Sequence, residues 1–92
     1  MPAKQITVSG RVQEVFFRST SRDIAVAMGL NGWVRNTDEG LVEMHIEGPQ
    51  EAVDRFEKWC HTGPPSAEVD TVHSKKVDDF GYTSFEIDHE WH

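Results

Sequence analysis

The segment Gly10–Arg18 combines residue types that can hold an anion. It lies where alternating apolar residues give way to helical spacing, so a strand should end and a helix begin there. The first turn of a helix leaves backbone N–H groups without intrahelical partners, and the helix dipole adds partial positive charge. Arg18 would add a formal charge and a planar set of donors. The segment is therefore a candidate oxyanion site, although an arginine in a first helical turn is more often only a solvated side chain.

Composition predicts one acidic domain over residues 1–92. Nine Lys and Arg against 16 Asp and Glu give a formal net charge of −7, which argues against nucleic acid or an anionic membrane as a partner. The chain has no apolar run near 18 residues, no signal-peptide pattern and a single cysteine, Cys60, so nothing indicates membrane insertion, export or a disulfide framework. We expect a cytoplasmic monomer.

Hydrophobic periodicity predicts a strand, a helix and a hairpin in the first half of the chain. Ile6 and Val8 alternate with polar residues, as in a half-buried strand. Apolar residues then recur at helical spacing as far as Met28, and Gly29 supplies a helix stop. The predicted elements are a strand over residues 4–12, a helix over 17–28, and a hairpin formed by Trp33–Arg35 and Leu41–Ile46 around the turn 36–40.

The second half of the chain predicts one helix and two strands. Pro49 stands where a helix start needs no N–H, and Gly63-Pro64-Pro65 cannot continue a helix. Val69 and Val72 are out of step with a period of two, which indicates a bulge or a late strand start. The predicted elements are a helix from Gln50 that ends before Gly63, a strand from Glu68 to about Val77, and a short strand at Phe85 and Ile87.

This order, β-α-β-β-α-β with a short extra strand, is typical of the ferredoxin-like α+β fold. That fold is an antiparallel sheet with two helices on one face. Many unrelated functions use it, so the function must be argued from the site.

Two separated motifs resemble those of the acylphosphatase family. Gly10-x-Val12-Gln13-x-Val15-x-Phe17-Arg18 is similar to the family signature G-x-V-Q-G-V-x-[FY]-R at all but one fixed position, and Gly29-Leu30-x-Gly32-Trp33-Val34-x-Asn36 follows at the family's spacing. The resemblance covers nearly the whole chain. The other matching positions are Ser21, Ala25, Val42-Glu43, Glu47-Gly48-Pro49, Gly63-Pro64-Pro65-x-Ala67-x-Val69 and Phe85-x-Ile87.

The resemblance implies hydrolysis of a small-molecule acyl phosphate to a carboxylate and inorganic phosphate, without a cofactor or metal. Arg18 matches the family's phosphate-binding arginine, and Asn36 matches the asparagine that positions the attacking water. By alternation Asn36 shares the helix-covered sheet face with Val34, so it can reach toward Arg18. The main-chain amides that would bind the phosphoryl group map onto Gln13, Glu14, Val15, Phe16, Phe17 and Arg18.

Glu14 departs from the family, which has glycine at this position. Glycine in an anion-binding loop usually indicates a positive φ or a close backbone approach, and a residue with a Cβ in the left-handed region costs roughly 1–2 kcal/mol. A carboxylate here would also repel phosphate, unless its side chain turns into solvent or pairs with Arg11 or Arg22. An alternative function is therefore a non-catalytic phosphate-binding or regulatory module, weakened by Glu14.

The remaining polar candidates carry weaker signals. The five histidines lack the spacing of metal motifs, although His89 and His92 with Glu90 could bind a metal adventitiously. Cys60 lies on the apolar face of the second predicted helix, which favours a core residue over a nucleophile. An RNA-binding domain of similar element order ranks far lower because of the acidic charge. Related domains also open the large carbamoyltransferases of hydrogenase maturation; since this chain stops at His92, we expect a free-standing enzyme.

Overall fold

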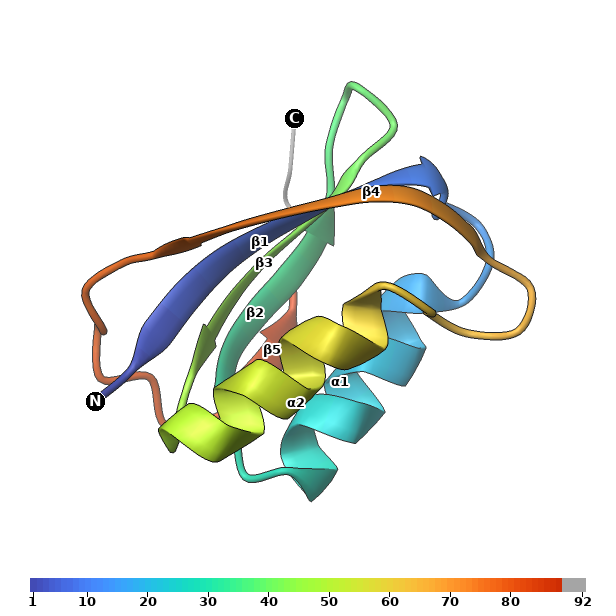
Figure 1. The fold of residues 1–92 in the computed structure, drawn as a ribbon. Helices are drawn as coiled ribbons and strands as arrows, with labels where there is room; N and C mark the ends of the chain where they lie inside the picture. The colour runs from blue at the N-terminus through green and yellow to red at the C-terminus, as the bar shows by residue number, and fades with distance from the viewer. Residues whose placement is uncertain (89–92) are drawn as a thin grey trace.

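A computed structural model describes residues 1–88 as a five-stranded sheet with both helices on one face (Figure 1). The strand order across the sheet is β4-β1-β3-β2-β5. No helix in this part of the chain is long and apolar enough to span a membrane. The elements are β1 (Ala3–Arg11), α1 (Phe17–Ala27), β2 (Asn31–Asn36), β3 (Val42–Glu47), α2 (Gln50–Cys60), β4 (Glu68–Lys76) and β5 (Phe85–Ile87).

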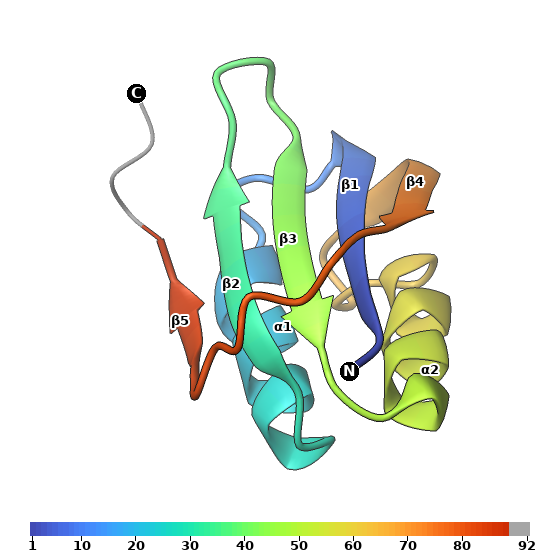
Figure 2. The ribbon, with the colours of Figure 1, turned by 90° about the vertical axis from the view of Figure 1, so that its left-hand side faces the viewer.

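The ferredoxin-like prediction is confirmed, and β5 extends it. The pairs β1–β3, β1–β4 and β2–β3 are antiparallel, whereas β5 runs parallel to β2, with Gly32 opposite Phe85. This parallel pairing is possible because residues 77–84, which we call the strap, cross the helix-free face of the sheet from the β4 edge to the β5 edge (Figure 2). The strap thus brings the end of the described chain beside the strand that carries Asn36.

The predicted irregularity in β4 is a bulge opposite β1. The register shifts between Ser9 and Gly10, so that Ser9 pairs with Thr71 and Gly10 with Val69. Gly10 has a φ of +119°, and a Cβ there would lie 2.2 Å from the carbonyl oxygen of Glu68. Only glycine fits this close approach. The bulge therefore fixes how β1 enters the loop that precedes α1.

The hydrophobic core lies between the sheet and the two helices. Alternate residues of the central strands face it, and each helix adds one apolar stripe. The burial of these side chains is the main driving force for folding. Representative core residues with no exposed surface are Ile6, Val8, Ala25, Val34, Met44, Ile46, Val53, Phe56 and Cys60.

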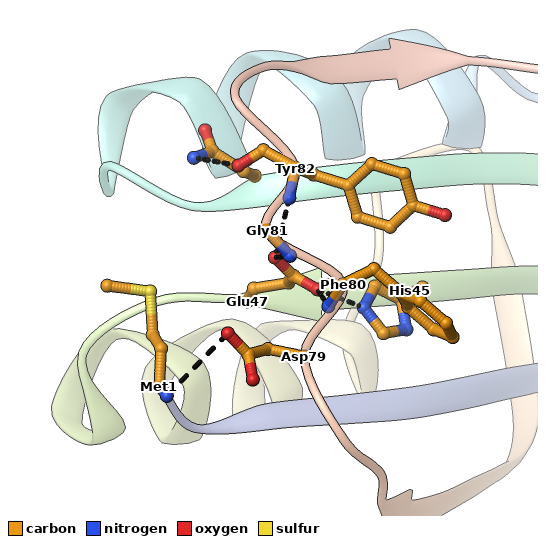
Figure 3. A network of polar contacts seen from close by, with 8 residues as sticks. Met1, His45, Glu47, Asp79, Phe80, Gly81 and Tyr82 are labelled. Carbon is orange, nitrogen blue, oxygen red and sulfur yellow. Dashed lines mark hydrogen bonds and ion pairs between the residues drawn. The ribbon is translucent and has the colours of Figure 1, made fainter.

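The strap is held to the sheet by the buried carboxylate of Glu47, at the end of β3 (Figure 3). Three successive strap amides donate to it: Phe80 N–H at 2.5 Å, Gly81 N–H at 3.1 Å and Tyr82 N–H at 3.0 Å. His45 Nε2 lies 2.7 Å from the same carboxylate. A buried carboxylate is tolerated only when it is hydrogen-bonded in this way.

The surroundings of Glu47 act on its pKa in opposite directions. Burial raises the pKa of the carboxyl group, but the hydrogen bonds from Phe80, His45 and Tyr82 outweigh burial and leave the pKa below its ordinary value. The rings of Phe80 and Tyr82 cover His45, each with its centroid 5.3 Å from the imidazole centroid. We call Glu47, His45 and the three strap amides the Glu47 anchor. Both its charge and its hydrogen-bond donors come from the chain itself.

Candidate active site

The loop between β1 and α1 contains two residues in the left-handed region. Glu14 has a φ of 61° and Phe16 a φ of 63°. Neither residue is glycine, so each carries a backbone strain of about 1–2 kcal/mol. The left-handed conformation that the glycine of the family signature suggests is thus present at Glu14 despite its Cβ. The signature gave no such signal for Phe16.

Bonds from both sides hold this loop in place. Gln13 Nε2 donates to the carbonyl oxygens of Thr37 and Leu41, each at 2.9 Å, and so ties the loop to the hairpin between β2 and β3. Ser66 Oγ donates to the carbonyl oxygen of Val15 at 3.0 Å, and the Val15 side chain is buried. Gln13 and Val15 therefore hold the loop in place through contacts with neighbouring segments of the chain. Its strained conformation is maintained by these contacts.

The loop leads directly into the N-terminus of α1, where Phe16 is the N-cap residue. Within residues 1–88, no side chain caps this end, and the first turn contains no acidic residue. Ser21 Oγ donates to the carbonyl oxygen of Arg18 at 2.9 Å and fixes the turn that carries the arginine. The first-turn amides thus keep the donor capacity and partial positive charge that suit an anion.

Asn36 is the last residue of β2, opposite Val42 of β3. It is 8 % exposed and lies on the helix-covered face with Val34, as the alternation predicts. Its Oδ1 atom is buried and has no hydrogen-bond partner in the described chain. Because a buried polar atom without a partner costs about 1–3 kcal/mol, such an atom requires an explanation beyond the fold.

One pocket of about 320 Å³ brings Asn36 together with Arg18. Of the predicted loop residues, Glu14, Phe16 and Phe17 also line it, whereas the side chains of Gln13 and Val15 do not. Sequence reasoning missed Val12, Ser19 and Ile87 as lining residues. Alternation predicted a strand at Ile87, but only the parallel pairing of β5 with β2 places that strand next to Asn36.

The carboxylate of Glu14 makes no bond to either arginine that the sequence suggested. Arg22 lies 3.2 Å from Asp23 instead, and the described residues contain no ion pair of Glu14 with Arg11. The Glu14 side chain is exposed at the edge of the pocket. Of the two alternatives left open by the sequence, solvent exposure is the one observed.

Cys60 and the three histidines of the described residues, His45, His61 and His73, lie outside this pocket. Burial raises the pKa of the Cys60 thiol far above its ordinary value, so the residue stays a neutral part of the core. His45 belongs to the Glu47 anchor. Residues 1–88 contain no group of three or more side chains able to hold a metal ion, while His89, Glu90 and His92 lie outside the described residues.

Comparison with known proteins identifies the family. The family model for acylphosphatase matches residues 4–87. The chain belongs to the acylphosphatase family. The acylphosphatase of Natronomonas pharaonis is 49 % identical over 82 residues, which cover 89 % of each chain. The crystal structure of acylphosphatase from Bacillus subtilis matches with a TM-score of 0.94 and 34 % identity, over 97 % of this chain and 100 % of that one.

A longer protein shares the same domain. The crystal structure of full-length HypF in its phosphate- and nucleotide-bound form matches with a TM-score of 0.90 and 30 % identity, covering 98 % of this chain and 12 % of that chain. As an acylphosphatase family member, the present chain hydrolyses acyl phosphates to a carboxylate and inorganic phosphate. None of these comparisons favours the non-catalytic alternative.

Proposed function

We propose that Arg18, Asn36 and the main-chain amides of residues 13–18 carry out this hydrolysis. Arg18 and the amides at the start of α1 bind the phosphoryl oxygens, and Asn36 orients the attacking water. The observation that carries the proposal is the buried Oδ1 of Asn36, which has no partner among residues 1–88 and lies in the same pocket as Arg18. An amide oxygen in that position can accept a hydrogen bond from a water molecule. The bond orients the water so that a lone pair of the water oxygen faces phosphorus.

The chemistry requires few groups. The water oxygen forms a bond to phosphorus while the bond from phosphorus to the acyl oxygen breaks, and the carboxylate leaves with the bonding electrons. Because a carboxylate is a weak base, its departure needs no proton donor. The proton of the water passes to a phosphoryl oxygen of the substrate, since an amide such as Asn36 cannot accept it. Donors on the equatorial oxygens stabilise the charge in the transition state.

Two substitutions test these roles with benzoyl phosphate as substrate. Arg18→Lys keeps a charge but loses the planar set of donors, and Asn36→Ala removes the water acceptor. Arg18→Lys should lower kcat at least roughly a hundredfold, the effect of removing one donor from a comparable anion site. Asn36→Ala should lower it by a similar factor, because the attacking water is no longer aligned. Circular dichroism and the free energy of unfolding should show that both variants stay folded.

Two matched controls lie on the same elements. Arg22→Lys changes the other arginine of α1, which contacts Asp23 at the surface, and Asn31→Ala changes the other asparagine of β2, which bonds the carbonyl oxygen of Tyr82. Both controls should keep kcat within about twofold, since surface changes of this kind have small effects. Retained activity in Arg18→Lys or in Asn36→Ala would contradict the assigned role.

The wider expectations from composition stay predictions. They are a single domain over residues 1–92, a monomer, a cytoplasmic location and no nucleic-acid partner. Light scattering on the purified chain tests the monomer, and cell fractionation tests the compartment. Binding to single-stranded RNA at low salt would contradict the last of them.

A further inference from the structure

The pocket is larger than a phosphoryl group requires. Since a water takes up about 30 Å³ in the liquid, a volume of about 320 Å³ corresponds to on the order of ten waters. The phosphoryl group occupies the end formed by Arg18, Asn36 and the first turn of α1 if the proposed function holds. The rest of the space is then left for the acyl group, and its lining determines which acyl groups fit.

Of the four apolar residues that line the pocket, Val12 and Phe17 are buried in the core, so Phe16 and Ile87 are the two that can present apolar surface to an acyl group. Phe16 is 77 % exposed although it is a large aromatic residue, and its positive φ adds strain. It makes no contribution to the core cluster, so the fold gives no reason for an aromatic residue here. Ile87 reaches the pocket from β5, where it is partly buried against the core. Together they offer an apolar surface to a ligand bound at the phosphoryl site.

The same pocket carries one uncompensated negative charge at its edge. The Glu14 carboxylate is exposed, and among the described residues it has neither a hydrogen bond nor an ion pair. Its backbone keeps a strained conformation that glycine would adopt without cost. The Glu14 carboxylate would interact with a charged group on the acyl part of a bound substrate. Solvent and salt screen this interaction only in part at the edge of the pocket.

We propose that these residues select the substrate by its acyl group: Phe16 and Ile87 bind an apolar acyl group, and Glu14 rejects acyl phosphates that carry a second negative charge. The proposal rests on the function given above, because it places the phosphoryl group beside Arg18. The substrate class is then acyl phosphates whose acyl group is apolar and either neutral or cationic.

Substrates of one size test the charge preference. We suggest 4-methylbenzoyl phosphate, 4-carboxybenzoyl phosphate and 4-(aminomethyl)benzoyl phosphate, which differ chiefly in the charge of a rigid para substituent. The kcat/KM of each, divided by its spontaneous hydrolysis rate, removes differences in intrinsic reactivity. The methyl compound should exceed the carboxy compound roughly fivefold, as expected for one charge pair near a protein surface. Added salt should reduce this ratio.

Glu14→Gln isolates the charge, because it keeps the size and the backbone strain. The ratio of methyl to carboxy substrate should fall at least about threefold in this variant. The aminomethyl compound, which the Glu14 charge attracts in wild type, should lose its advantage over the methyl compound. The repulsion between Glu14 and the phosphoryl group is common to all three substrates, so it cancels in the ratio. A ratio that is unchanged between wild type and Glu14→Gln would overturn the charge selection.

Phe16→Ala tests the apolar contact. The preference for benzoyl phosphate over acetyl phosphate should fall roughly tenfold, mainly through a higher KM for benzoyl phosphate. Val26→Ala is the matched control, because Val26 is an apolar residue on α1 that is 60 % exposed and does not line the pocket. It should leave the preference unchanged. An equal preference in wild type and Phe16→Ala would overturn the apolar contact.

The outcomes separate this inference from the proposed function. If wild type hydrolyses all the substrates and Arg18→Lys does not, but Glu14→Gln and Phe16→Ala show the wild-type selectivity, only the acyl selection is wrong. If Arg18→Lys hydrolyses them as fast as wild type, the phosphoryl site itself is wrongly placed, and the acyl selection built on it is also overturned.

Discussion

The Glu47 anchor and the start of α1 both use main-chain N–H groups, but in opposite ways. At Glu47, three strap amides and His45 surround a carboxylate that the chain itself supplies. Within residues 1–88, no side chain caps the start of α1, its first turn contains no acidic residue, and the nearby Asn36 Oδ1 has no hydrogen-bond partner. The first region pairs its own buried polar groups, whereas the second leaves Asn36 Oδ1 without a partner among residues 1–88.

This difference explains what each region contributes. A satisfied buried charge holds two distant segments together and contributes to stability. Strained residues and an unpartnered polar atom lower stability. Proteins therefore keep them mainly at sites where they serve binding or catalysis. Substitutions in the Glu47 anchor should therefore change folding more than catalysis, and substitutions in the pocket should do the reverse.

The largest effect should follow Asn36→Leu, which replaces the unpartnered amide by an apolar group of similar size. Loss of the group that aligns the attacking water should lower kcat roughly a hundredfold, which corresponds to about 2.7 kcal/mol of activation free energy. The free energy of unfolding should rise by about 1 kcal/mol, because a buried polar atom is lost. Steady-state kinetics and urea denaturation measure the two changes. A destabilised variant would mean that the Asn36 side chain supports the fold.

Glu47→Gln should lower the stability of the fold and leave the hydrolysis rate nearly unchanged. It removes the charge that three amides share, so the free energy of unfolding should fall by about 1.5–3 kcal/mol, as for hydrogen bonds to charged groups. The hydrolysis rate of the folded fraction should change much less. Glu86→Gln is the control, since the Glu86 side chain is exposed and, among residues 1–88, its carboxylate accepts a hydrogen bond only from the nearby Ser84 Oγ. Equal stability of both variants would contradict the anchor.

The pH dependence of stability gives a weaker test of the same region. Hydrogen bonds leave the pKa of Glu47 below its ordinary value of 4.5 in the folded chain. A lowered pKa means that the stabilisation is fully present above that value and is lost as the pH falls through it toward the folded-state pKa. Urea denaturation between neutral and acid pH should show this loss in wild type. The slope should be shallower in Glu47→Gln, and an identical slope would contradict the pKa direction.

The smallest effect should come from Glu14→Gly. Relief of the left-handed strain should raise the free energy of unfolding by about 1 kcal/mol, and removal of the charge should strengthen inhibition by inorganic phosphate. Glu14→Ala separates the two causes, because it removes the charge and keeps the Cβ. It should strengthen phosphate inhibition without a gain in stability. Unchanged inhibition in both variants would show that Glu14 points away from the anion.

Local patterns in the sequence were enough to predict the fold. The out-of-step Val69 and Val72 predicted the bulge that the register shows at Ser9 and Gly10. The strand and helix order followed from periodicity, with element ends that differ by about one or two residues. The position of Asn36 on the helix-covered face followed from alternation with Val34.

Local sequence patterns could not predict the contacts between residues that are far apart in the chain. Nothing local indicates that Glu47 binds the amides of Phe80–Tyr82, because the bonds use backbone groups that every residue type provides. The positive φ of Glu14 could be expected only because the family signature has glycine there, and Phe16 had no such signal. Ile87 lines the pocket because β5 pairs in parallel with β2, an arrangement that the strap makes possible.

The most direct measurement of the central claim is a titration of the ¹⁵N-labelled protein with inorganic phosphate, followed amide by amide in NMR spectra. We predict saturable shifts at the amides of residues 13–18 and at the Asn36 side-chain amide, and none at Phe80, Gly81 or Tyr82. Arg18→Lys should weaken these shifts. Saturable shifts confined to the strap, or no saturable shift at the start of α1, would contradict the claim that this turn binds the phosphoryl group.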